Sequence, residues 1–217
     1  MASLTSKSVD IVKPVVAGQF YPSDPEELLR DVRRYIEEAD IEPAQESVFA
    51  ILSPHAGYVF SGPVAGYSYR YVQNQRPDTI LILALSHRHA IDGGCVFSGH
   101  SFATPLGCID VDEEFTQALL KQGKPLYSDA TPYLTEHSIE VNLPFIQWIF
   151  PRARVATILT SHADESLCHQ LGMQIVSALT QFPQKRVLLV VSSDMSHYPP
   201  YEIANRIDRE MLESVEK

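Results

Sequence analysis

The sequence predicts an α/β protein built around a largely parallel sheet. Four apolar runs alternate with stretches of helical periodicity, and this order is typical of parallel strands joined by crossover helices. Each run ends in a small hydroxyl residue that a histidine closely follows, and these histidines are His55, His87, His162 and His197. Ligands of open α/β sheets bind beyond the carboxyl ends of the strands. Half of the eight histidines are therefore expected at one functional edge, where they indicate a metal-binding site.

The amino-terminal part is predicted to hold two helices around the first strand. Ser23 or Asp24 can cap a helix at 25–39, in which apolar side chains recur along one face. A strand in the run 50–55 follows. The glycines and proline of the next segment then lead into a helix expected at 64–75. The positive amino end of that helix favours an anion in the pocket.

The second apolar run, 80–87, is the next strand, and the region 93–108 after it is predicted to be a hairpin or meander beside the parallel core. The runs 155–162 and 187–197 predict two further strands. Helical periodicity predicts four more helices, at 110–122, 139–150, 165–182 and 201–215. The last helix reaches Lys217 without a stop signal. We therefore expect a single domain over residues 1–217 that lacks a carboxyl-terminal segment.

The composition excludes several classes of protein. A chain of 217 residues suits one large domain. Its net charge of −10 leaves no basic stripe, so nucleic acid is not an expected partner. No apolar run approaches the roughly 18 residues of a membrane span, and the amino terminus has no secretory signal pattern. Three widely spaced cysteines without a CxxC pair predict a reduced, cytoplasmic protein.

Two strand-end histidines are the first candidates for ligands or catalytic groups. His55 lies in a turn with proline and glycine neighbours, which allows a ligand to approach closely; the alternative is a histidine that only caps the strand. His87 lies directly at the end of its strand and is favoured over His89. Arg88 between them is either a solvated loop residue or a group that neutralises an anionic substrate.

Two further segments offer catalytic residues. Asp194 is close enough in sequence to orient His197 as a general acid or base; the alternative is a network that satisfies buried backbone groups. His137 lies near the start of a predicted helix, where the dipole lowers the imidazole pKa and suits binding of an oxyanion. A capping box formed by Ser138 or Thr135 has equal weight.

The other histidines are expected to be structural or on the surface. His162 precedes residues typical of a helix cap, and His100 and His169 carry no supporting pattern. The sequence contains no GxSxG elbow and no activated cysteine. Serines lie beside several histidines, however, so a metal-independent hydrolase stays an alternative.

Six segments of the chain carry a shared set of motifs: 16–22 (VAGQFYP), 54–62 (PHAGYVFSG), 85–87 (LSH), 103–107 (ATPLG), 136–140 (EHSIE) with Leu143 and Pro144, and 191–197 (VSSDMSH). Together these segments resemble the Memo family, and they occur in the family's order through nearly the whole chain. The family is similar in turn to the class III extradiol dioxygenases, and its human member mediates receptor-driven cell motility.

The resemblance implies a three-layer α/β/α sandwich with a mixed, mostly parallel sheet and a pocket that holds non-haem Fe(II) in the dioxygenases. It implies that His55 and His87 are metal ligands for iron or copper. His197 matches the acid/base histidine, and Asp194 and His137 line the same pocket. The family's third ligand is a cysteine in a carboxyl-terminal strand, and it has no counterpart in this chain.

These implications give one leading hypothesis and two alternatives. The leading hypothesis is a Memo-like protein whose dioxygenase-type pocket binds a redox-active divalent metal and supports oxidoreductase activity. The first alternative is a non-catalytic signalling or interaction protein that holds a small molecule, a peptide or a partner protein in the pocket. The second is a metal-independent hydrolase.

Overall fold

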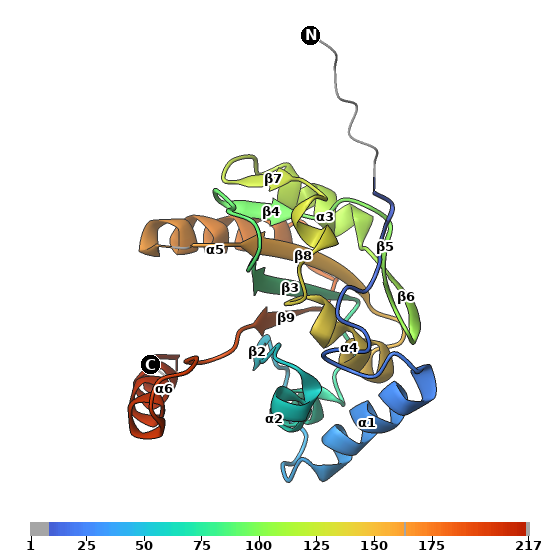
Figure 1. The fold of residues 1–217 in the computed structure, drawn as a ribbon. Helices are drawn as coiled ribbons and strands as arrows, with labels where there is room; N and C mark the ends of the chain where they lie inside the picture. The colour runs from blue at the N-terminus through green and yellow to red at the C-terminus, as the bar shows by residue number, and fades with distance from the viewer. Residues whose placement is uncertain (1–8, 163, 216–217) are drawn as a thin grey trace.

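A six-stranded sheet forms the centre of the computed structural model, which describes residues 9–162 and 164–215. Its strand order is β2-β9-β3-β8-β4-β7 (Figure 1). Neighbouring strands are parallel, except that β4 is antiparallel to β8. The sheet is therefore mixed and mostly parallel, as predicted. In this order the strands span Ala50–Ser53, Val187–Ser192, Thr79–Leu85, Arg154–Thr160, Gly94–Val96 and Leu126–Ser128.

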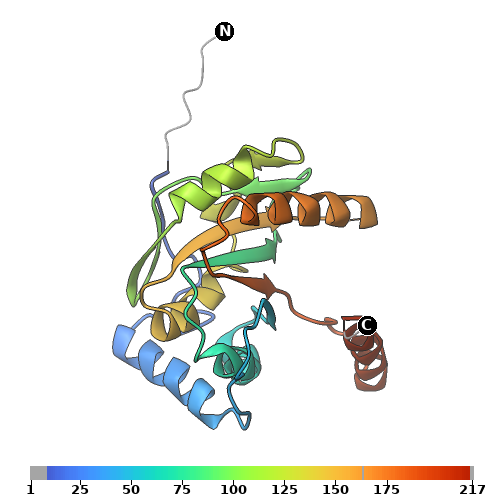
Figure 2. The same cartoon turned by 180° about the vertical axis from the view of Figure 1, so that it is seen from behind.

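Helices cover both faces of the sheet, which confirms the three-layer α/β/α fold (Figures 1 and 2). One face packs against α1, α2 and α4, and the other packs against α3 and α5. In chain order these helices span Pro25–Glu38, Tyr58–Val72, Glu113–Leu120, Leu143–Ile149 and Glu165–Leu179.

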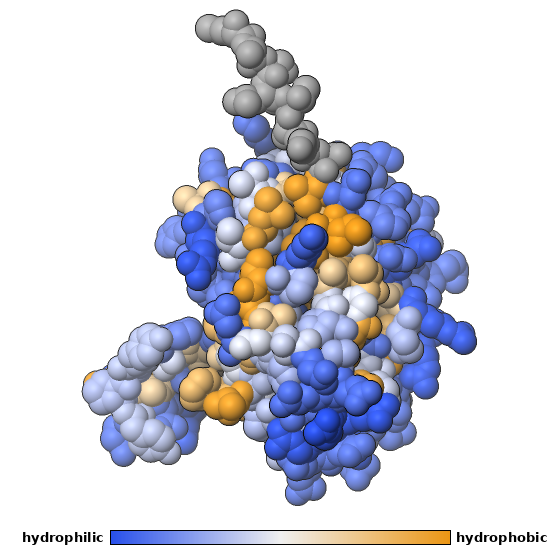
Figure 3. Space-filling model, turned by 45° about the vertical axis from the view of Figure 1, so that its right-hand side comes forward, coloured by the Kyte–Doolittle hydropathy of each residue, from blue (hydrophilic) through white to orange (hydrophobic). Residues whose placement is uncertain are grey.

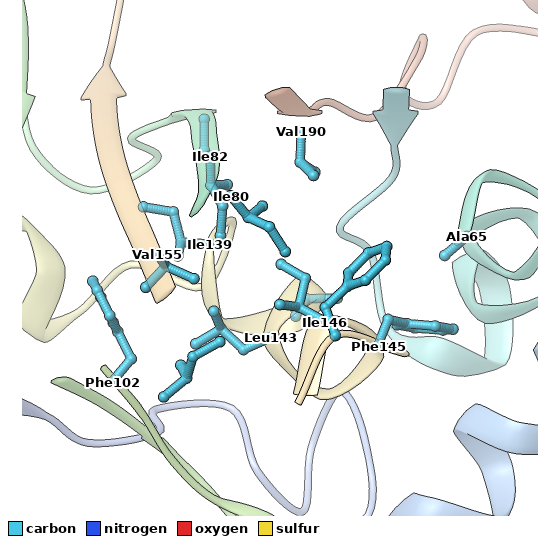
Figure 4. Packing of buried hydrophobic residues seen from close by; sticks show 14 of the residues in the cluster. Ala65, Ile80, Ile82, Phe102, Ile139, Leu143, Phe145, Ile146, Val155 and Val190 are labelled. Atoms are coloured by element: carbon cyan, nitrogen blue, oxygen red, sulfur yellow. The ribbon is translucent and has the colours of Figure 1, made fainter. Parts of the chain in front are cut away.

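The side chains of β3 alternate between the two layers. Ile80 and Ile82 pack in the cluster that contains Leu143 of α4 (Figure 4), whereas Leu81 packs with Phe115 of α3. All five side chains are buried. Burying each large apolar side chain contributes roughly 1.5–3 kcal/mol. The near-continuous apolar run of β3 therefore follows from its position between two helical layers.

The region 93–108 divides between two sheets. A second, three-stranded sheet contains β1 (Ile11–Val12), β5 (Ser101–Thr104) and β6 (Gly107–Asp110). β5 and β6 form the predicted antiparallel hairpin. β4 instead joins the main sheet, and the short strands β1 and β7 were not predicted.

Several predicted helix boundaries are wrong, and the reasons are local. α3 starts at Glu113 rather than at 110, because the Asp112 side chain caps it by accepting a hydrogen bond from the Phe115 N–H. The segment predicted as a helix at 139–150 begins as a 3₁₀ turn at Glu140–Asn142 and becomes α-helical only at Leu143. α5 ends at Leu179, before 182.

α2 begins at Tyr58 rather than at residue 64. Gly62 therefore lies inside the helix, where it is a packing position and not part of a turn. A Cβ atom on Gly62 would lie 2.5 Å from the Tyr35 ring, and one on Gly66 would lie 2.2 Å from the Tyr35 carbonyl oxygen. These two glycines let α1 approach α2 closely.

We expect Gly66→Ala to destabilise the protein by about 2–4 kcal/mol, because the added methyl meets backbone that cannot move aside easily. Gly172→Ala in α5 is the matched control, since a Cβ added there would have no neighbouring atom within 4 Å. The control is expected to gain up to about 1 kcal/mol from helix propensity. Urea unfolding of both variants checks the pair, and equal stabilities would contradict the packing role.

α6 (Tyr201–Val215) has the predicted bounds but packs against no other layer, and it has no buried residue. Its apolar side chains Ile203, Ile207 and Met211 recur on one side and remain exposed. The rest of the face seen in Figure 3 is mostly hydrophilic, with apolar residues gathered in a band across it. Within the described ranges, no helix has both the length and the apolar character needed to cross a membrane.

Candidate metal centre

Three histidines from separate segments meet at the carboxyl ends of the strands. His55 follows β2, His87 follows β3, and His137 lies just before the 3₁₀ turn Glu140–Asn142. Each offers a ring nitrogen, and the three nitrogens lie within 4.8 Å of one another. His55 is buried, His137 is half-buried, and the His87 side chain is 39% exposed. The cluster therefore has one open side.

Parallel pairing explains why the first two histidines meet. β2 and β3 flank β9 as its two neighbours, so their carboxyl ends lie at the same edge of the sheet. The His55 and His87 ring centroids are 5.2 Å apart. His137 completes the group, with its ring centroid 4.6 Å from that of His87 and 5.7 Å from that of His55.

Glu136 anchors two of the three histidines. Its carboxylate accepts hydrogen bonds from the His87 N–H (2.5 Å), the His137 N–H (2.9 Å) and the Ser138 N–H (3.0 Å). The His87 Nδ1 lies 2.9 Å from Oε1, and the His137 Nδ1 lies 3.2 Å from the same oxygen. Burial raises the pKa of Glu136, but these hydrogen bonds outweigh it, so the pKa is lowered.

The tautomer of His87 follows from this arrangement. Because the pKa of Glu136 is lowered, its carboxylate is ionised near neutral pH and can only accept hydrogen bonds. The neutral His87 ring therefore donates its Nδ1–H to Glu136, and the lone pair on its Nε2 is free to bind a metal ion. Metal-ligating histidines in proteins usually donate their other ring N–H to a carboxylate in this way.

His55 is fixed by a second network around Ser192. The Ser192 hydroxyl donates to the Ser138 carbonyl at 2.6 Å and accepts from the Asn142 Nδ2 at 3.0 Å. Its contact with the His55 Nδ1, at 2.8 Å, must therefore be a bond in which the histidine donates. The His55 Nε2 is left with its lone pair free.

The rings of His55 and His137 are held in the neutral form that binds metals. Burial lowers the pKa of His55 to about 4; Asp194 opposes this shift, and the neighbouring His87 and His137 add to it. Burial is also the main cause of the lowered pKa of His137, with Glu136 opposing the shift and His87 adding to it. The direction for His137 agrees with the sequence prediction, but its cause is burial rather than a helix dipole.

This burial predicts that the metal-free protein is acid-sensitive. With a pKa of about 4 in the folded state and roughly 6.5 in the unfolded state, His55 binds a proton between these values only when the chain unfolds. Its stabilising contribution is complete above about pH 6.5 and is lost as the pH falls toward about 4. The expected loss is about 3 kcal/mol. Urea unfolding at several pH values measures it, and an unchanged pH slope in His55→Asn would contradict the assignment.

Asp194 joins the two loops that flank the cluster. Its Oδ1 accepts hydrogen bonds from the His55 N–H at 2.7 Å and the Ala56 N–H at 3.2 Å. Its Oδ2 lies 3.8 Å from the His55 Nε2 and 3.6 Å from the His197 Nε2. The structure thus brings Asp194 and His197 together, with the His197 side chain 56% exposed.

The remaining histidines lie outside the cluster. His162 is exposed next to α5, whose amino end is capped by the Asp164 side chain, and His100 and His169 are also exposed. The His89 Nε2 contacts the Thr135 hydroxyl at 3.1 Å. The capping-box interpretation of the segment near His137 is wrong, because the Ser138 hydroxyl donates to the Leu85 carbonyl and fastens that segment to the end of β3.

Glu136, Ser192 and Glu140 are the supporting residues that sequence reasoning missed. Glu140 accepts hydrogen bonds from the Val15 N–H (2.7 Å), the Val16 N–H (3.1 Å) and the Tyr21 hydroxyl (2.5 Å). It thereby ties the amino-terminal segment to the segment that carries His137. The sequence signal for these supporting roles was the pair of glutamates on either side of that histidine. A single sequence does not show which backbone groups their carboxylates bind.

The donor set fits a transition-metal ion. Imidazole nitrogens suit zinc, copper, iron and nickel, and here three of them converge at the carboxyl ends of the strands. A cation at about 2.1 Å from each nitrogen holds its ligand atoms roughly 3.4 Å apart. A small contraction of the cluster, led by the exposed His87, therefore allows binding. The site can hold a metal ion and leave coordination positions open toward solvent.

Ser192 is poorly placed for hydrolytic chemistry. It is the serine whose side chain contacts a histidine of the cluster, yet it is 1% exposed and its hydroxyl proton is given to the Ser138 carbonyl. A nucleophilic serine needs its proton directed at a base. In this pair the histidine is the donor.

The fold and the site define a three-layer α/β/α protein with a candidate three-histidine metal centre at the strand ends. Comparison with known proteins names the family: the Memo-like protein family matches residues 13–217. The chain belongs to the Memo family, as its sequence motifs predicted.

The relatives of this chain include archaeal proteins described as MEMO1 family proteins. The one from Methanopyrus kandleri is 32% identical over 211 residues, which cover 93% of this chain and 74% of that protein. The one from Saccharolobus islandicus strain M.14.25 is 34% identical over 216 residues, covering 94% and 76%. The one from Saccharolobus solfataricus is 32% identical over 215 residues, with the same coverage of 94% and 76%.

Proposed function

We propose that this Memo family protein binds a redox-active divalent metal ion, iron or copper, through His55, His87 and His137. The observation that carries the proposal is the orientation of the rings. Ser192 and Glu136 occupy the Nδ1 atoms of His55 and His87, and Glu136 lies against the Nδ1 of His137. All three Nε2 atoms are therefore available as ligands.

The proposed activity is that of an oxidoreductase acting on a small molecule or peptide at the open side of the site. When bound, the ion would supply Lewis acidity and one-electron redox chemistry next to the substrate. His197 is exposed enough to meet a substrate and accepts or releases a proton at its Nε2. The Asp194 Oδ2, at 3.6 Å, positions that ring.

Metal loading followed by oxygen uptake tests this function. The protein is incubated anaerobically with Fe(II), Cu(II) or Zn(II), freed of excess ion, and analysed for metal per chain. Loaded samples are then assayed with a panel of catechols. We expect about one ion per chain and oxygen uptake that falls roughly 10²–10⁴-fold in His197→Gln, with the metal content unchanged.

Two results would overturn parts of this proposal. Absence of bound metal after all three incubations would contradict the metal site. Full metal loading with persistent absence of oxygen uptake would contradict the oxidoreductase and favour a non-catalytic protein that uses the pocket to hold a peptide or a partner protein.

A cytoplasmic location is part of the proposal. Cys95, Cys108 and Cys168 are all unpaired in the structure, and free cysteines are typical of reducing compartments. Fractionation of cells that express the tagged protein tests the location, and recovery in a membrane or secreted fraction would contradict it.

A further inference from the structure

A cleft of about 840 Å³ lies at the amino ends of the central strands, whereas the histidines lie at the carboxyl ends. It is bordered by residues at or just before the amino ends of three central strands: Asp78 before β3, Arg154 at the start of β8, and Arg186 before β9. β3 has seven residues, and a strand rises about 3.3 Å per residue. The cleft is therefore roughly 20 Å or more from the metal centre and is a separate site.

The cleft gathers positive charge on a protein that is acidic overall. Five of its lining residues are basic and two, Asp78 and Asp112, are acidic, a formal excess of three positive charges. The whole chain carries a net charge of −10. Such a local reversal of sign attracts anions. The basic residues are Arg76, Arg152, Arg154, Lys185 and Arg186.

Nearby carboxylates neutralise only part of this charge. The Lys185 Nζ lies 2.7 Å from the Asp112 Oδ2 and 3.5 Å from the Glu114 Oε2, and the Arg186 Nη2 lies 3.3 Å from the Asp78 Oδ1. Arg76 donates through Nη1 to two backbone carbonyls, which leaves its charge uncompensated.

Arg152 and Arg154 are the basic residues of the cleft that are available to bind a ligand. Both are exposed, and neither lies within ion-pair distance of a carboxylate among the described residues. They flank the buried Ala153 at alternate positions, and both line the cleft. Guanidinium groups bind phosphate through two parallel hydrogen bonds, so two such groups suit a ligand with adjacent phosphates.

The cleft also has an apolar wall, formed by Ile149 and Phe150 at the end of α4 together with Pro77 and Pro151. Its volume is in the range of pockets that hold small organic ligands. We propose that this cleft binds a small organic diphosphate, with the phosphates on Arg152 and Arg154 and the organic part against the apolar wall. A nucleoside diphosphate has the size and chemistry required.

Calorimetric titration of the metal-free protein with ADP and with inorganic pyrophosphate tests this site. We expect ADP to bind more tightly than pyrophosphate because it also contacts the apolar wall, and both affinities to fall with added salt. The double variant Arg152→Gln with Arg154→Gln is expected to lose at least tenfold in affinity for both. Thermal unfolding of this variant checks that it folds, and both replaced side chains are exposed.

The matched control is Arg206→Gln with Arg209→Gln, which removes the same charge from exposed positions of α6. It is expected to bind ADP as the unmodified protein does. No binding of either probe, unchanged affinity in the cleft variant, or an equal loss in the α6 control would overturn the site. Pyrophosphate binding as tight as that of ADP would overturn the contribution of the apolar wall.

Discussion

His55→Ala is expected to reduce bound metal from about one ion per chain to almost none. His55 is the buried member of the triad, 2% exposed, and its ring is held by Ser192 at 2.8 Å. Losing a supporting hydrogen bond costs roughly 10–100-fold in metal affinity, and losing a ligand is expected to cost more. Metal analysis after removal of excess ion measures the change.

His162→Ala is the matched control for this loss. It removes the same type of side chain from the end of another strand of the sheet, but His162 is exposed and lies outside the triad. It is expected to keep a full equivalent of metal. His55→Ala with undiminished metal, or a similar loss in both variants, would show that His55 is not a ligand.

Glu136→Gln is expected to weaken both the fold and the site. The carboxylate is buried and receives three backbone N–H groups and the His87 ring. The glutamine side chain carries no negative charge, and its NH₂ group faces these N–H donors. At least one of the donors is then left without an acceptor. We expect a loss of about 2–4 kcal/mol in the free energy of unfolding and a roughly 10–100-fold loss in metal affinity.

Urea unfolding and metal titration of Glu136→Gln measure these two effects. Glu113→Gln is the control, because that side chain is 72% exposed and its carboxylate contacts the exposed His100 ring at 3.5 Å. An exposed pair of this kind is worth little, so the control is expected to change stability by less than about 0.5 kcal/mol. A Glu136 variant as stable as the control would contradict its anchoring role.

The sequence predicted the layers and the main helices because their signals are local. The apolar run of β3 and the capped start of α1 at Asp24 each follow from neighbouring residues. The same holds for the strand-end positions of His55 and His87, which the parallel order of the sheet then brings together.

What the sequence did not predict depends on contacts between distant segments. The sequence around Gly62 is the same whether this glycine forms a turn or makes room for Tyr35 beside a helix. The packing of α1 on α2 shows that it makes room for Tyr35. Glu136 carries no mark of its role, because its partners include backbone groups at His87, far away in sequence. His137 was predicted to line the pocket, but its position against the other two rings depends on that same glutamate.

The central claim is that three histidines hold one metal ion through their Nε2 atoms. Anomalous diffraction from crystals of the loaded protein, recorded at the absorption edge of the bound metal, tests it most directly. We predict one anomalous peak per chain, about 2.0–2.2 Å from the Nε2 atoms of His55, His87 and His137, with Glu136 still bonded to the His87 Nδ1. A peak at another set of residues, or ligation that excludes His137, would contradict this claim.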